Sequence, residues 1–229
     1  MSFSPVDDFV QSLIKGLCRK FSFKEVGETT IADKLSVELL EFSRHFQDYV
    51  LAIIYKIPAP LITSKDLFAT FLGSVCSDIC SLEETVERRF FILCAFITNM
   101  TTLSFMMPCY RLIQDVEAVL KFQLKMKLSL SFDSDVKVVF ENLEGKIFEL
   151  TADRHWIRAR LHQLRKFIQK AGDIRSLGLE NQPDVATRLK TVYDMKTQKS
   201  TNDAESNEDE PCPYCESNCK DFLESFLSC

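Results

Sequence analysis

The sequence predicts an all-α, elongated helical protein, and two observations carry that prediction. The first is the scarcity of turn residues: 229 residues include only 6 Gly and 7 Pro, whereas a β-sandwich or barrel needs a turn every ~8–12 residues. The second is periodicity, because apolar side chains recur at steps of three and four over most of the chain. Hydrophobic residues make up 46% of the sequence, which excludes a wholly disordered polypeptide.

The first expected element is an N-terminal helical hairpin within residues 1–60. Residues 5–21 carry an apolar side chain at every fourth position, and Pro5 suits a first helical turn. A second apolar stripe begins at Leu35 and stops at residues 57–60, whose two prolines break the helix because proline lacks the N–H. Two such helices bury a small core only with outside help, which indicates an obligate assembly.

A middle helical section is expected over residues 61–132, and it contains an unusual stretch. Residues 90–108 carry no charged side chain, and their length approaches that of a membrane span. Threonine, asparagine and serine side chains in the middle of the stretch raise the cost of insertion into a bilayer. We therefore expect a helix buried in protein. The alternative is a membrane-associated helical protein anchored by residues 90–108.

The most regular pattern predicts a coiled-coil helix over residues 133–172. Seam positions alternate steps of four and three without a slip, a spacing that keeps one narrow face against a partner helix. The predicted seam is Val136, Phe140, Leu143, Ile147, Leu150, Arg154, Ile157, Leu161, Leu164 and Ile168. Arg154 is its one polar member, of the kind that sets register or partner choice. An ordinary bundle helix is the alternative.

Charge along this helix is also ordered. Residues 154–170 hold six basic side chains and no acidic one, whereas acids gather in the first part of the helix. Complementarity to the helix dipole explains this order. A basic strip that meets an acidic partner helix is a compatible functional interpretation, and neither suggests catalysis.

The C-terminal part is expected to comprise a short helix within residues 173–198 and a disordered acidic tail over residues 199–229. The tail carries eight acidic side chains against two lysines, so it accounts for a charge of −6 in a chain whose net charge is −5. Few large apolar residues occur there, which is typical of disorder. The remaining chain is nearly neutral, which argues against direct contact with nucleic acid.

Nine cysteines without a secretory signal indicate a reducing compartment, the nucleus or cytosol. Five of them, Cys109 included, lie among apolar residues and are expected to fill the core. Cys212, Cys215 and Cys219 are the candidate metal ligands, with Cys229 as a fourth, since structural zinc takes four. A flexible reduced tail is the favoured interpretation, and metal binding is the alternative. No motif for a nucleophile, a phosphate loop or a His-Glu-x-x-His metal site occurs, so we expect neither an enzyme nor a bound cofactor.

One segment carries a family resemblance. Residues 42–61 read FSRHFQDYVLAIIYKIPAPL, and this run resembles the signature of the Mis-twelve centromere protein family, a helix that ends in Ile-Pro followed by Leu. The matching positions are Phe42, Phe46, Tyr49, Leu51, Ile54, Ile57, Pro58 and Leu61. The helical order that follows is also similar, whereas residues 90–108 and the cysteine tail have no counterpart in that family.

The resemblance implies a structural subunit of the kinetochore complex that links centromeric chromatin to the microtubule-binding outer kinetochore. Such a protein would act in the nucleus, at the centromere, in chromosome segregation during mitosis and cell division. Its partners would be the other helical subunits of a hetero-oligomeric complex. The expected contact residues are Phe42, Phe46, Tyr49, Ile57 and Pro58 in the hairpin, with Phe140, Leu143, Ile147, Leu150, Arg154, Ile157, Leu161 and Leu164 along the seam.

Overall fold

The computed structural model describes residues 5–21, 31–107, 109–127, 145, 147–173, 177–201, 212 and 219–228. Every regular element in these ranges is a helix, so the all-α prediction is confirmed. The elements are α1 (Pro5–Phe21), α2 (Ile31–Ile54), α3 (Pro60–Thr63), α4 (Lys65–Cys80), α5 (Val86–Met106), α6 (Leu112–Met126), α8 (Arg154–Gly172), α9 (Val185–Thr201) and α10 (Cys219–Ser228).

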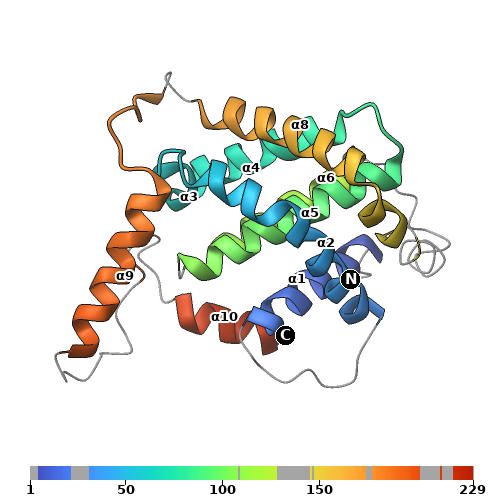
Figure 1. The fold of residues 1–229 in the computed structure, drawn as a ribbon. Coiled ribbons are helices and arrows are strands. Elements are labelled where there is room, and N and C mark those ends of the chain that lie inside the picture. The colour runs from blue at the N-terminus through green and yellow to red at the C-terminus, as the bar shows by residue number, and fades with distance from the viewer. Residues whose placement is uncertain are drawn as a thin grey trace.

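Helix α5 lies in the middle of the bundle, and α1, α2, α4 and α6 pack around it (Figure 1). Every side chain from residue 90 to residue 101 is buried. A helix that is apolar on all sides must be covered on all sides, so the expectation of a helix buried in protein is confirmed. Within the described ranges, α5 is also the one helix with the length and composition of a membrane span, and most of it is buried inside the protein.

The polar side chains of α5 are compatible with this burial because the helix itself satisfies them. Asn99, Thr101 and Ser104 each donate a hydrogen bond to the carbonyl four residues earlier, at 2.8, 3.0 and 3.0 Å respectively. A buried polar group without a partner would cost free energy. These local bonds remove that cost without a water molecule.

Helices α1 and α2 contact each other as the hairpin predicts, and both also pack against α5. On α2 the buried positions after Phe46 are Val50, Leu51 and Ile54, whereas Tyr49 and Ile53, which continue the apolar stripe that begins at Leu35, are only half-buried. At 3.6 residues per turn Ile53 falls on the same side of α2 as Phe42 and Phe46, so the change in burial comes from how the neighbouring helices cover this end of α2. Tyr49 and Ile53 lie at the edge of the core, on the side of α8.

The uninterrupted helix expected over residues 133–172 is wrong for the described part of that range. Residues 147–152 are helical, but Asp153 leaves the helical conformation, with φ −82° and ψ 77°. Its side chain accepts a hydrogen bond from the Trp156 N–H at 2.9 Å and caps α8, because aspartate is a preferred N-cap residue. Helix α8 then lies across α2 and α4 instead of projecting as a stalk (Figure 1).

The tail expected to be disordered over residues 199–229 contains a helix, α10, which packs on α1. The Lys15 ammonium of α1 lies 5.9 Å from the centre of the Phe226 ring. The helix has one apolar face, made by Phe222, Leu223, Phe226 and Leu227. Its spacing is helical but spans little more than one turn, too short for the periodicity to stand out from the acidic sequence around it.

The turn after α2 anchors the start of α9, which otherwise projects from the bundle (Figure 1). Pro58 and Asp184 form an isolated antiparallel bridge. On either side of it the Ala59 N–H donates to Pro183 O at 2.8 Å, and the Val185 N–H donates to Ile57 O at 3.0 Å. One cluster of buried side chains draws on helices α1 to α10, α9 included through Val185, so the expected hairpin, middle section and coiled-coil ranges share a core.

Candidate functional site

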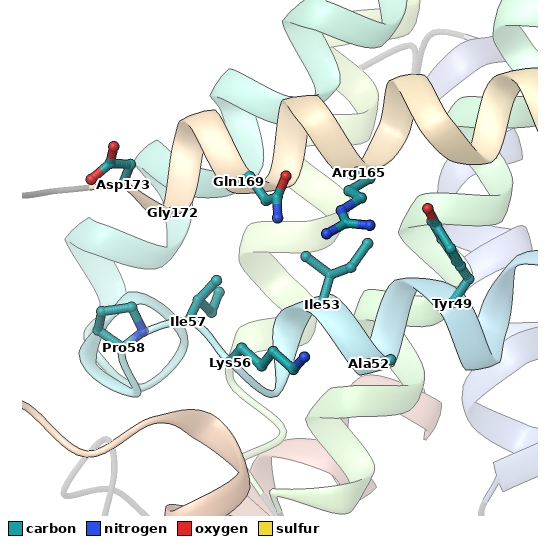
Figure 2. Close-up of a pocket in the computed structure, with 10 residues that line it drawn as sticks. All are labelled: Tyr49, Ala52, Ile53, Lys56, Ile57, Pro58, Arg165, Gln169, Gly172 and Asp173. Carbon is teal, nitrogen blue, oxygen red and sulfur yellow. The ribbon is translucent and has the colours of Figure 1, made fainter.

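An open groove of about 470 Å³ lies between the C-terminal halves of α2 and α8 (Figure 2). Its α2 side is mostly apolar, and its α8 side is mostly polar. The lining residues are Tyr49, Ala52, Ile53, Lys56, Ile57 and Pro58 on one side, and Arg165, Gln169, Gly172 and Asp173 on the other. Helical periodicity explains the first set, because residues 49, 52, 53 and 56 share one face of α2.

At one end of the groove, the end of α2 lies close to the end of α8. Proline at position 58 terminates α2, and the chain turns away immediately below the last residue of α8. A Cβ atom built on Gly172 would lie 2.8 Å from Ile57 Cγ2. Glycine is thus the residue that lets the two helix ends come this close.

Two basic side chains, those of Lys56 and Arg165, line the groove beside its apolar residues. The side chains of Lys56 and Arg165 are exposed, and neither forms an ion pair with any residue that the structure describes. Figure 2 shows the Arg165 side chain reaching from α8 toward Ile53. Two turns earlier on α8, Arg158 is exposed on the same face. This combination suits an apolar segment that carries carboxylates.

The five contact residues predicted in the hairpin divide into two groups. Tyr49, Ile57 and Pro58 line the groove. Phe42 and Phe46 are fully buried, with ring centroids 5.3 Å apart, and Phe42 also lies 5.7 Å from the Phe91 ring of α5. These two rings hold α2 against α5, so they are not available to a partner.

The predicted seam is largely covered by the protein's own helices. Ile147, Leu150, Ile157 and Leu164 are buried, and Leu161 is half-buried. Arg154 was expected within the seam but is exposed in the first turn of α8, directly after the break at Asp153. Phe140 and Leu143 lie outside the described residues.

Glu84 makes tertiary contacts that its sequence context did not predict. It lies in the turn after α4, is 8% exposed, and accepts a hydrogen bond from Trp156 Nε1 at 3.2 Å. Its carboxylate also forms ion pairs with Arg160 at 2.7 Å and with Arg88 at 3.4 Å. Glu84 therefore fixes the N-terminal half of α8. No local motif could reveal the contacts with Trp156 and Arg160, because these residues lie more than seventy positions along the chain.

The candidate metal ligands fall in a separate cluster below α5. The Sγ atoms of Cys109, Cys212 and Cys219 all lie within 4.8 Å of one another, and all three residues are buried. Cys109, expected to be a core filler, is thus a member of the cluster. Cys215 and Cys229 lie outside the described residues. Burial raises the pKa of the neighbouring Tyr110 hydroxyl, and the nearby thiols of Cys219 and Cys212 raise it further.

The other buried cysteines behave as the core fillers expected from the sequence. Burial raises the pKa of Cys18 to about 12 and that of Cys80 to about 11. It also raises the pKa of Cys76 and Cys94 well above the ordinary range. These thiols stay protonated at neutral pH, and protonated thiols are poor nucleophiles and poor metal ligands.

The described residues therefore contain two candidate binding sites, the groove between α2 and α8 and the three-cysteine cluster at the end of α5. Both are built from segments that are distant in sequence. No protein-family model, curated protein or solved structure matches the chain.

Proposed function

We propose that the protein is a structural subunit of a kinetochore complex that links centromeric chromatin to the microtubule-binding outer kinetochore through helix–helix contacts. One observation supports the proposal above the others. Tyr49, Ile57 and Pro58, which belong to the segment that resembles the Mis-twelve family, line an open groove. The aromatic side chain and the Ile-Pro turn are thus placed where another chain can contact them.

The proposed occupant of the groove is an amphipathic helix of a partner subunit with acidic residues along one edge. Apolar side chains of that helix would cover Ile53 and Tyr49, and this burial would supply most of the affinity at about 25 cal/mol per Å². Carboxylates would meet Lys56 and Arg165. Exposed ion pairs each contribute only about 0.2–1 kcal/mol, so the cations mainly orient the partner and speed association.

The cellular part of the proposal is tested by imaging a fluorescently tagged copy through mitosis in its host cell. Paired foci on condensed chromosomes, coincident with a centromere marker, are the expected result. A reticular or nuclear-envelope pattern would overturn the kinetochore assignment and favour anchoring of residues 90–108 in a membrane.

The molecular part is tested with the double variant Lys56→Glu/Arg165→Glu. Both side chains are exposed, so the fold should be unchanged by circular dichroism. Co-purification of kinetochore subunits and the intensity of the foci should both fall, with affinity weakened roughly tenfold.

The matched control is Lys166→Glu/Lys190→Glu, which makes the same change of charge at exposed positions outside the groove. It should localise as the wild type does. Equal behaviour of the two double variants would show that net charge, and not the groove, governs binding. Foci of full intensity in the Lys56→Glu/Arg165→Glu variant would exclude the groove as the contact.

A further inference from the structure

Three cysteines from distant parts of the chain meet at one point of the fold. Cys109 follows the C-terminal end of α5, Cys219 is the first residue of α10, and Cys212 lies between α9 and α10. Their Sγ atoms are mutually within 4.8 Å, and no other group of three metal-binding side chains in the described ranges meets that distance. In Figure 1 the first turn of α10 lies beside the last turn of α5.

We propose that Cys109, Cys212 and Cys219 bind one zinc ion, which fastens α10 to the end of α5. The proposal does not depend on the groove or on the kinetochore assignment. The ligands of this site come from the middle and from the C-terminal part of the chain.

The sulfur spacing suits zinc. A Zn–S bond is about 2.3 Å, so two sulfurs of a tetrahedral site are about 3.8 Å apart. Sulfurs within 4.8 Å of one another need to move by about 1 Å or less on average to reach that geometry. Three thiolates are soft ligands, and zinc is the abundant divalent ion that such a set favours.

A disulfide explains the cluster less well. An S–S bond is about 2.05 Å long and joins two sulfurs, so it would leave the third buried thiol without a role. The reducing compartment expected for a chain with this cysteine usage also disfavours a disulfide. A single zinc ion would be bound by all three cysteines.

Binding is a ligand exchange without oxidation or reduction. Three S–H bonds break, three Zn–S bonds form, and three protons leave to solvent for each zinc taken up. The fourth coordination position is left for water or another donor. Zn²⁺ neutralises two of the three negative charges that the buried thiolates would carry, so the site keeps a net charge of −1.

The site would clamp a helix that has few other contacts. Within the described residues α10 packs mainly on α1. Zinc would add a second attachment, to the turn between α5 and α6. Loss of the metal should therefore loosen α10 while leaving α4 and α5 folded, because their cores are built from other side chains.

The test starts with the full chain purified under reducing conditions. Its metal content is measured by inductively coupled plasma mass spectrometry, and its zinc affinity by titrating zinc into metal-free protein against a chromogenic chelator. About one zinc per chain is expected, with release of protons on binding. Replacement of zinc by cobalt(II) should give a thiolate-to-cobalt charge-transfer band.

The variants Cys109→Ser, Cys212→Ser and Cys219→Ser should each lose most of the bound zinc and weaken the cobalt band. The matched control is Cys76→Ala, whose thiol is buried in α4 and outside the cluster, and it should keep about one zinc per chain. Hydrogen exchange of the α10 amides should accelerate at least about tenfold after chelation. This readout does not depend on any variant being folded.

Three results would overturn the proposal. One is a reduced wild-type chain that takes up neither zinc nor cobalt. Another is full zinc content in all three serine variants. The third is a disulfide between two of the three cysteines in peptide mapping, together with no metal uptake after reduction.

Discussion

Gly172 lies so close to Ile57 that a Cβ atom on the glycine would stand 2.8 Å from Ile57 Cγ2. The backbone of the last turn of α8 thus packs directly against the Ile57 side chain, just after the end of α2. Both residues line the groove, so the shape of this end of the groove depends on residue 172 having no side-chain methyl group.

Gly172→Ala should destabilise the protein. The added methyl group would push α8 from Ile57 or distort that side chain, and overpacking of this kind costs about 1–3 kcal/mol. Alanine recovers about 0.5–1 kcal/mol of backbone entropy, so a net loss is expected. Urea denaturation measures the free energy of unfolding.

Gly73→Ala in α4 is the control for Gly172→Ala. A Cβ atom there has no neighbour within 4 Å, so this change should stabilise the protein by up to about 1 kcal/mol. Equal gains in both variants would mean that the contact between Gly172 and Ile57 relaxes without cost.

Glu84→Ala should be the most destabilising of these changes, by roughly 2–4 kcal/mol. It removes the counter-charge of Arg160, which is 17% exposed, and the acceptor of Trp156 Nε1. Trp156 is the single tryptophan of the chain, so its fluorescence reports the change directly in a denaturation curve. Glu83→Ala alters an exposed neighbour and should stay within about 0.5 kcal/mol of the wild type. Similar losses for both would argue against the Glu84 network.

Gln123→Met should stabilise the protein by about 1–2 kcal/mol. Gln123 is 3% exposed, and no described residue donates a hydrogen bond to its Oε1 atom. Methionine has a similar length and carries no amide to desolvate. Thermal unfolding should show a higher Tm. A lower Tm would indicate that the amide has a partner in solution.

Asp184 should make the start of α9 sensitive to acid. The Thr187 N–H donates to its carboxylate at 2.8 Å, and the hydrogen bonds from Thr187 hold the pKa of Asp184 below its ordinary value. A lowered pKa means that the cap stabilises the helix at neutral pH, and that this effect is lost as pH falls through the lowered pKa. Exchange of the Thr187 amide, corrected for its intrinsic rate, should rise in that range.

Two replacements separate the charge of Asp184 from its capping. Asp184→Asn keeps a capping side chain, so exchange at Thr187 should lose its pH dependence and stay slow. Asp184→Ala should weaken the first turn of α9 by about 1 kcal/mol at neutral pH, and its difference from the wild type should shrink as the pH falls. An unchanged pH profile in Asp184→Asn would assign the effect to another group.

Local patterns predicted much of the fold and little of the candidate site. The helical class and the buried α5 follow from periodicity and from an uncharged run, which are properties of consecutive residues. The burial of Val50 in place of Tyr49 on α2 does not follow from local patterns, because it depends on where the neighbouring helices lie. Aspartate is a preferred N-cap residue, but the apolar spacing is regular on both sides of Asp153 and so indicated one continuous helix.

The groove and the cysteine cluster both needed tertiary structure. Arg165 approaches Ile53 only because α8 folds back across α2. Cys109 looked like a core residue because its neighbours in sequence are apolar, and Cys212 comes beside it from the other end of the chain. The spacing of residues along the sequence carries no information about contacts between such distant segments.

The central position of α5 has a consequence for biosynthesis. Helices α1, α2 and α4 are translated first, and the apolar faces of all three are covered by α5. Until residue 106 has left the ribosome, we expect the nascent chain to hold helices α1 to α4 with apolar faces that α5 does not yet cover, the kind of exposed apolar surface that recruits chaperones. A stall or truncation before α5 should therefore yield an aggregation-prone fragment, whereas chains that end after α6 should already be able to close.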